Sequence, residues 1–92
     1  MKITIIGAGN MGGALAKGWA KVATNDNIDI TVTARSQYTL DKIKVASPTL
    51  HCSQSNTEAI QGASIIVLAV KPWLIGNVVE EIRHSINADN QI

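Results

Sequence analysis

The sequence predicts an α/β fold in which helices cover a parallel β-sheet. Short apolar runs alternate with segments whose apolar residues recur at helical spacing, an order typical of parallel strands joined by right-handed crossovers. The strongest run, residues 65–70, is apolar at every position, as a central parallel strand buried on both faces must be. The 92 residues, 46% of them hydrophobic, suit one domain with a modest core.

The first half of the chain predicts two strands and two helices. A strand is expected at 2–6 and a helix at 10–22, with apolar residues along one side and small ones, including Gly18, suited to close packing on the sheet. A second strand is expected at 28–33, where apolar and polar residues alternate and predict one less buried face. A weaker helix follows at 36–45.

A short third strand at 49–53 precedes a helix start. Ser55 and Glu58 have the spacing of a capping box, in which hydroxyl and carboxylate reciprocally satisfy free N–H groups. Gly62 suits the end of this helix, because glycine tolerates the left-handed backbone found there.

The last third predicts the strongest strand and a helix. The strand is expected at 64–70, and Pro72 then occupies a first helical position, in a helix reaching about Ile86. Gln91 and Ile92 resemble the opening of a further strand. We therefore expect this chain to be the front part of a longer polypeptide.

A glycine-rich motif follows the first strand without a gap. It has the pattern G-x-G-x-x-G and consists of Gly7, Ala8, Gly9, Asn10, Met11 and Gly12. In dinucleotide-binding folds the three glycines allow the tight turn, the approach of backbone to the pyrophosphate and close helix–strand packing. The helix N-terminus then offers N–H groups and a positive dipole end to the phosphates. Strand, motif and helix in this order predict a Rossmann-type, doubly wound sheet with a nucleotide site.

The end of the second strand bears on which dinucleotide binds. NAD sites usually carry Asp or Glu about 20 residues past the glycines, whereas this strand leads into Arg35 and Ser36. An acid would repel a 2′-phosphate, while Arg35 can pair with one. Ser36 can donate a hydrogen bond or cap the next helix. The sequence therefore favours NADP(H), with NAD(H) as the alternative.

Further candidates lie where the third and fourth strands end, at the edge where ligands bind in such sheets. The backbone after the fourth strand is expected along the cofactor, at Ala69, Val70, Lys71 and Pro72. Lys71 either meets a phosphate or substrate anion or is simply solvated. Asn56 either hydrogen-bonds ribose or caps a helix, and Trp73 either walls the pocket or rests at a domain contact.

Composition argues against several other functions. A net charge of +1 implies no polyanion partner, and 3% aromatic residues leave little for stacking on nucleic-acid bases. The apolar runs are far too short to span a membrane or to form a signal peptide, so a cytoplasmic protein is expected. Cys52 has no partner for a disulfide or a zinc site, and no metal site is expected. His51 and His84 are expected to be structural or solvent-facing rather than catalytic.

These motifs together resemble pyrroline-5-carboxylate reductase, the enzyme family that makes L-proline. The resemblance rests on residues 6–12, 14–18 and 69–72, and on Ser55-Asn56 with Glu58-Ala59 ahead of the fourth strand. It covers essentially the whole chain. Many dehydrogenases share the glycine loop, but its combination with the Val-Lys-Pro segment is more specific.

The resemblance implies reduction of the C=N bond of 1-pyrroline-5-carboxylate by hydride transfer from NADPH, or sometimes NADH. It places residues 7–12 at the pyrophosphate, Arg35 and Ser36 at the adenosine phosphate, Asn56 at ribose and residues 69–72 near the nicotinamide. It also implies a helical domain beyond residue 92 that dimerises and supplies most of the imino-acid site. Residues 1–92 would then be the cofactor-binding domain of a homo-oligomer, without catalytic groups and inactive alone.

Two rival interpretations stay open. One is another reductase with the same loop, such as an F420-dependent NADP reductase or a hydroxyacid dehydrogenase. The other is a non-enzymatic module that senses NAD(P). An FAD or adenosylmethionine site is a weaker third option, because the second strand lacks a terminal acid.

Overall fold

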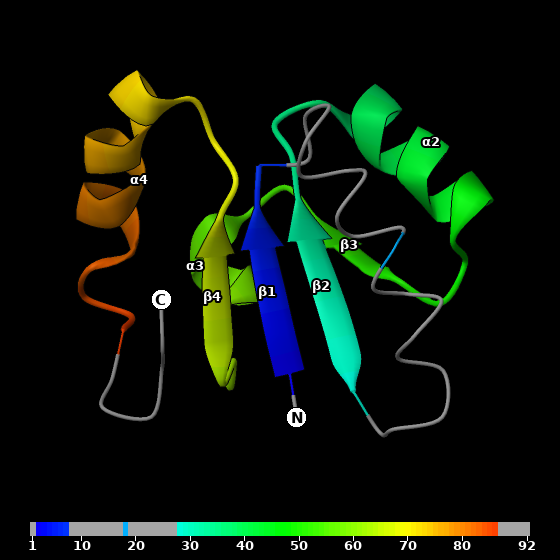
Figure 1. Ribbon diagram of the computed structural model, residues 1–92, viewed down its shortest axis with the longest axis horizontal. Coiled ribbons are helices and arrows are strands. Elements are labelled where there is room, and N and C mark those ends of the chain that lie inside the picture. Colours follow the sequence, from blue (N-terminus) through cyan, green and yellow to red (C-terminus); the bar gives the residue numbers. More distant parts are fainter. Residues whose placement is uncertain (1, 8–17, 19–27, 87–92) are drawn as a thin grey trace.

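The protein forms a parallel four-stranded sheet with helices packed against it (Figure 1). The computed structural model describes residues 2–7, 18 and 28–86. The strands are β1 (Lys2–Ile6), β2 (Asp29–Thr33), β3 (His51–Ser53) and β4 (Ile65–Leu68). All three pairings are parallel, which confirms the predicted fold class.

The strand order is β3-β2-β1-β4, so the chain builds outward from β1 and then returns to its other side. The expectation that the fourth strand is central is therefore wrong for the described sheet: β4 lies at its edge, and Ile66 is its one buried residue. The carboxyl ends of β1 and β4 therefore flank the point at which the winding reverses. In open α/β sheets, ligands bind in the crevice beyond this point. The topology alone directs attention to the residues that follow β1 and β4.

Both faces of the sheet are packed. One face carries Ile5, Val32 and their neighbours, and Ile43 of α2 (Gln37–Ala46) packs against them. The other carries Ile6 and Ile66. It is covered by residues around α3 (Asn56–Ala59) and by α4 (Ile75–Ile82), and Figure 1 shows α3 behind the sheet. The sheet is thus doubly wound, as predicted.

The expectation that β2 has one less buried face is wrong. Thr31 and Thr33 retain only 7% and 2% exposure, although they alternate with the apolar residues. The cause is α3, which packs on this face, and Thr4 of the adjacent strand is also fully buried there. The Thr4 hydroxyl donates to the Ala59 carbonyl across 2.7 Å, so a polar side chain is buried without losing its hydrogen bond.

Within the described residues the helices begin where predicted; α3 and α4 end earlier than expected, whereas α2 ends at Ala46, one residue past the expected end. The helix expected at 10–22 lies outside the described residues except for Gly18. Ser36 is the N-cap of α2 and Ser55 is the N-cap of α3. Pro72 opens a short 3-10 turn, η1 (Pro72–Leu74), which leads into α4. Because α4 ends at Ile82, the segment up to Ile86 continues as turns rather than as helix.

The capping box at Ser55 is only half formed. The Ser55 hydroxyl accepts the Glu58 N–H at 3.3 Å, but the Ser55 N–H donates to the Ser53 hydroxyl at 3.0 Å. Ser53 therefore takes the place that the Glu58 carboxylate was expected to fill. Gly62 has the positive φ of 74° expected after a helix.

Two other expectations involve residues next to or within the segments that the structure does not describe. Gly18 is helical and exposed, and a Cβ added there would meet no described atom within 4 Å, so it is not needed for close packing on the sheet. The further strand expected at Gln91 and Ile92 lies outside the described residues. No helix within the described part is long and apolar enough to cross a membrane.

Candidate dinucleotide-binding site

The ends of β1 and β4 meet at Gly7. Gly7 has φ +96°, and a Cβ added there would lie 2.6 Å from Val70 Cγ1 and 2.8 Å from the Ala69 carbonyl oxygen. Both distances are shorter than real Cβ contacts, so only glycine fits between these segments. The Ala69 N–H donates to the Ile6 carbonyl at 2.9 Å, which extends the β1–β4 pairing by one residue. The first glycine of the motif thus packs directly against Ala69 and Val70, the first two residues of the segment expected along the cofactor.

Gly7 also connects β1 to β2. Its N–H lies 3.2 Å from the Thr33 carbonyl oxygen and 3.3 Å from the Thr33 hydroxyl. Because this N–H is bonded within the fold, Gly7 supports the turn rather than donating to a phosphate. The remaining motif residues lie outside the described residues: Ala8, Gly9, Asn10, Met11 and Gly12.

Arg35 and Ser36 follow β2 directly at the same edge. The Ser36 hydroxyl accepts the Thr39 N–H at 3.5 Å, which confirms its role as the N-cap of α2. The Arg35 side chain is exposed, and its carbonyl accepts a hydrogen bond from the Gln54 side chain at 2.9 Å. Arg35 therefore projects from a turn whose backbone is fixed.

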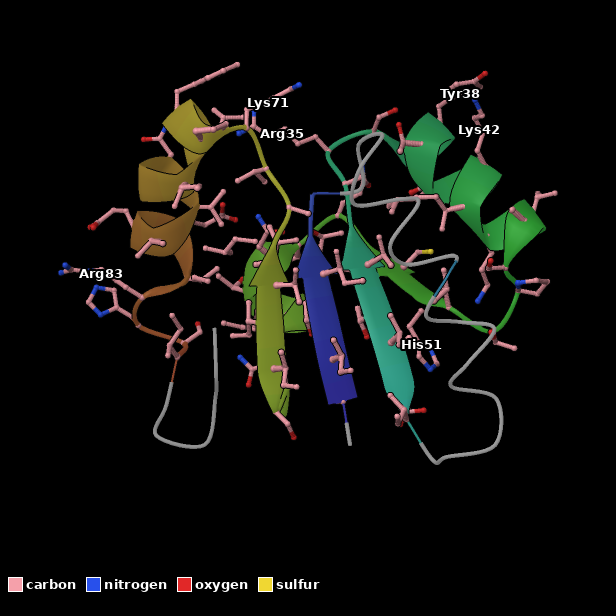
Figure 2. All side chains as sticks on the ribbon, in the orientation of Figure 1. Arg35, Tyr38, Lys42, His51, Lys71 and Arg83 are labelled. Carbon is pink, nitrogen blue, oxygen red and sulfur yellow. The ribbon has the colours of Figure 1, made fainter. Side chains whose placement is uncertain are left out.

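Lys71 and Pro72 begin η1 beyond the end of β4. The Lys71 carbonyl accepts the Leu74 N–H at 2.8 Å, and the Lys71 side chain is exposed. Figure 2 shows Arg35 and Lys71 at one edge of the sheet, whereas His51 and Arg83 lie away from it. The arrangement brings two cations to the ligand edge.

These two cations are not paired with carboxylates of the described residues. The ion pair found in that part of the chain joins Arg83 to Glu80, at 3.4 Å. Arg35 and Lys71 can therefore meet an anion without first breaking an internal ion pair. Phosphate is the ligand that an exposed arginine at a helix N-terminus suits best.

Asn56 is not a helix cap, because Ser55 fills that position. Instead its side-chain amide donates to a Glu81 carboxylate oxygen of α4 across 3.2 Å. A carboxylate only accepts hydrogen bonds, so this contact directs the amide NH₂ of Asn56 toward α4. Its carbonyl oxygen is then left as an acceptor, which is the group that a ribose hydroxyl needs.

The two histidines, the cysteine and Trp73 add no charged or nucleophilic group to this edge. His51 and His84 are exposed, as predicted. Burial raises the pKa of the Cys52 thiol, with the Asp41 carboxylate adding to the rise and the Lys44 ammonium opposing it. Such a thiol is a poor nucleophile. Trp73 is 74% exposed on η1, and both of its proposed roles stay open.

Sequence reasoning missed two members of this edge. Thr33 receives the Gly7 N–H, and Gln54 donates to Arg35. Neither belongs to a motif. Their position in the sequence could have found them. Thr33 ends β2, which pairs with the strand before Gly7, and Gln54 follows β3, which pairs with the strand before Arg35.

The chain is similar to several oxidoreductases. It is 33% identical to pyrroline-5-carboxylate reductase 3 of Danio rerio, over all of this chain and 31% of the relative. It is also 32% identical over 101 aligned residues to an Anaeromyxobacter glycerol-3-phosphate dehydrogenase [NAD(P)+], covering all of this chain and 30% of that protein. The chain thus spans about a third of the length of these curated relatives.

Solved structures give the same picture. The pyrroline-5-carboxylate reductase of Coxiella burnetii matches with a TM-score of 0.75 and 34% identity, over 94% of this chain and 31% of its own. The pyrroline carboxylate reductase of Plasmodium falciparum, solved with NADP bound, matches with a TM-score of 0.70 and 31% identity, over 92% of this chain and 29% of its own. Both likenesses agree with the Rossmann-type fold.

One family model matches nearly the entire chain, at residues 2–92. It describes NADP oxidoreductases that depend on coenzyme F420. The match agrees with the parallel sheet of the Rossmann-like fold. The chain belongs to this family, NADP oxidoreductase coenzyme F420-dependent.

Proposed function

We propose that this chain is the NADP(H)-binding part of a pyrroline-5-carboxylate reductase. The observation that carries the proposal is the contact of Gly7 with Ala69 and Val70, where a Cβ would meet atoms at 2.6 and 2.8 Å. This contact requires a glycine at the point where the winding reverses, which is where the first glycine of a pyrophosphate-binding turn lies in such folds. The reductase relatives and the NADP-bound neighbour support the choice of reaction.

The residues present fit a dinucleotide along the carboxyl edge. The glycine motif and the following helix would face the pyrophosphate, and Arg35 with the N-terminus of α2 would face a 2′-phosphate. The Asn56 carbonyl oxygen would accept from ribose, and residues 69–72 would lie near the nicotinamide. Lys71 would add a positive charge close to the substrate's carboxylate.

In the proposed reaction a bound reduced nicotinamide supplies a hydride to the carbon of the substrate's C=N bond. The imine can arrive protonated on nitrogen, so hydride and proton together give the saturated ring of L-proline. The role of this chain is then to bind and orient, because hydride transfer needs close, fixed carbons more than it needs a side-chain acid. We further propose that a helical domain outside residues 1–92 dimerises and supplies the groups around the imino acid.

Coenzyme titration of the intact protein tests the cofactor assignment. Arg35→Asp replaces a cation with an anion, so NADPH affinity should fall by roughly ten- to a hundredfold or more, while NADH affinity changes little. The control is Arg83→Asp, which makes the same charge change on an exposed residue away from the ligand edge (Figure 2). Equal losses for both coenzymes would remove Arg35 from the site.

Substrate profiling tests the reaction. With NADPH, the intact protein should reduce 1-pyrroline-5-carboxylate faster than dihydroxyacetone phosphate or oxidised coenzyme F420. Turnover of dihydroxyacetone phosphate would instead favour the function of the glycerol-3-phosphate dehydrogenase relative. Turnover of F420 would favour the activity that the family description names. Binding without turnover of any of the three would favour a sensing module.

A further inference from the structure

A side-chain hydrogen bond joins the turn after β2 to the residue after β3. The Gln54 side-chain amide donates to the Arg35 carbonyl across 2.9 Å, between residues 19 positions apart. This distance is typical of a well-formed N–H···O bond. The bond reaches the backbone of the one arginine that the sequence and the charge distribution both place at the ligand edge.

The main chain on either side of Gln54 makes other hydrogen bonds. The Ala34 N–H donates to the Ser53 carbonyl at 3.3 Å, which carries the β2–β3 pairing one residue past the strands. Two residues beyond Ser53, the Ser55 N–H bonds back to the Ser53 hydroxyl at 3.0 Å as the chain enters α3. Gln54 lies between these two points, and its side chain reaches across where the main chain does not.

The bond fixes the peptide unit between Arg35 and Ser36. Ser36 is in turn fixed by its cap, since its hydroxyl accepts the Thr39 N–H and its carbonyl accepts the Leu40 N–H at 3.2 Å. With both sides of that peptide unit restrained, the direction in which Arg35 leaves the backbone is set. The Arg35 guanidinium itself is exposed, so the orientation of its backbone limits the space that it samples.

We propose that Gln54 is a positioning residue for coenzyme selection: it holds the β2–α2 turn so that Arg35 is presented to the 2′-phosphate of NADP(H). This inference rests on the proposed function. A group that is already held in its bound geometry loses less conformational entropy on binding, which raises affinity without a new contact. The gain in affinity applies only to a ligand that Arg35 contacts, so it should raise the affinity for NADPH and not the affinity for NADH.

The neutrality of Gln54 suits this position. Its amide offers a donor to the carbonyl without placing charge near a phosphate, whereas an ionised glutamate at the same place could only accept and would repel the phosphate. Gln54→Met is therefore the informative change, because methionine keeps the approximate length of the side chain and removes the amide that donates to the Arg35 carbonyl. Gln61→Met is the matched control, since the exposed Gln61 also donates to a backbone carbonyl, that of Thr57, at 3.3 Å within its own turn.

The experiment is calorimetric titration of the intact protein with NADPH and with NADH. Gln54→Met should weaken NADPH binding by about three- to tenfold, the loss expected for one hydrogen bond, and should leave NADH binding unchanged. Gln61→Met should change neither. In an Arg35→Met background, Gln54→Met should cause no further loss of NADPH affinity, because no guanidinium is left to position.

Each other outcome is decisive. Equal losses of affinity for NADPH and NADH would mean that Gln54 supports the whole fold. No loss for either coenzyme would mean that the turn is rigid without Gln54. Either result overturns the positioning role of Gln54 and leaves the proposed function standing. If Arg35→Met itself leaves NADPH preference intact, the phosphate site of the proposed function fails, and the inference fails with it. Thermal unfolding of each variant shows whether it is folded at the titration temperature.

Discussion

Substituting Gly7 tests the junction on which the site depends. In Gly7→Ala the new Cβ would lie 2.6 Å from Val70 Cγ1 and 2.8 Å from the Ala69 carbonyl oxygen, whereas carbon atoms pack best at about 3.5–4.0 Å. The Val70 side chain can rotate, but the Ala69 carbonyl belongs to backbone whose N–H is bonded to Ile6. The junction therefore cannot relax without loosening the end of the β1–β4 pairing.

The expected cost has two parts. A non-glycine residue at φ +96° costs roughly 1–2 kcal/mol in backbone strain, and overpacking of this kind typically costs about 1–3 kcal/mol. Together they predict a loss of roughly 2–5 kcal/mol in the free energy of unfolding. That is a large share of the roughly 5–15 kcal/mol that stabilises an ordinary domain, so the variant should unfold at clearly lower denaturant.

Substitutions at two other glycines distinguish the backbone strain from the overpacking. Gly62→Ala meets a positive φ of 74° but nothing within 4 Å, so it should cost only the backbone strain. Gly76 is in α4, also with nothing within 4 Å, and Gly76→Ala should stabilise the helix by about 0.5–1 kcal/mol. Urea unfolding followed by circular dichroism measures all three. If Gly7→Ala costs no more than Gly62→Ala, the close approach of Gly7 to Ala69 and Val70 is refuted.

Three further predictions concern the stability of the fold around the site. Thr4→Val removes the buried hydroxyl that donates to Ala59 and should cost about 1–3 kcal/mol in urea unfolding; a wild-type midpoint would refute it. Ser55→Ala removes the N-cap of α3 and should lower stability by about 1 kcal/mol in thermal unfolding. Burial raises the pKa of the Cys52 thiol above 9.0, while Lys44 opposes the shift, so the folded protein keeps the thiol proton to a higher pH than the unfolded chain does. The stability that this contributes is fully present below the ordinary pKa of 9.0 and is lost as pH rises through the raised pKa. The difference in unfolding free energy between wild type and Cys52→Ala should therefore shrink as pH rises above 9.0.

The fold class was predictable because its signals are local. Apolar runs mark the strands, and Ser36, Ser55 and Pro72 mark helix starts through hydrogen bonds and dihedral preferences that involve only a few neighbouring residues. Each of these starts is confirmed. The end of α4 was less accurate: the apolar spacing continues to Ile86, whereas the helix ends at Ile82, and no glycine or proline in the sequence marks that end.

Burial of polar residues was not predictable from local pattern. The alternation in β2 indicated a solvent-facing side for Thr31 and Thr33, yet α3 covers that side. What the pattern lacked was the identity of the covering element, which comes from a segment more than 20 residues later in the chain. A threonine in such a strand is compatible with either face, because its hydroxyl can be satisfied by backbone, as Thr4 is by Ala59.

The same distinction holds within the candidate site. Arg35 and Lys71 could be predicted because the carboxyl edge of a parallel sheet collects whatever follows each strand, and the structure brings both to that edge (Figure 2). Gln54 could not, since its contact with Arg35 depends on β3 lying beside β2 and on the Ser53 hydroxyl turning the main chain away. A site in this fold is thus assembled in two steps: topology gathers the strand ends, and cross-links between neighbouring loops set the direction of each side chain. If the Gln54 titration gives the expected result, the second step is one by which this chain tunes its coenzyme preference without a change in the glycine motif.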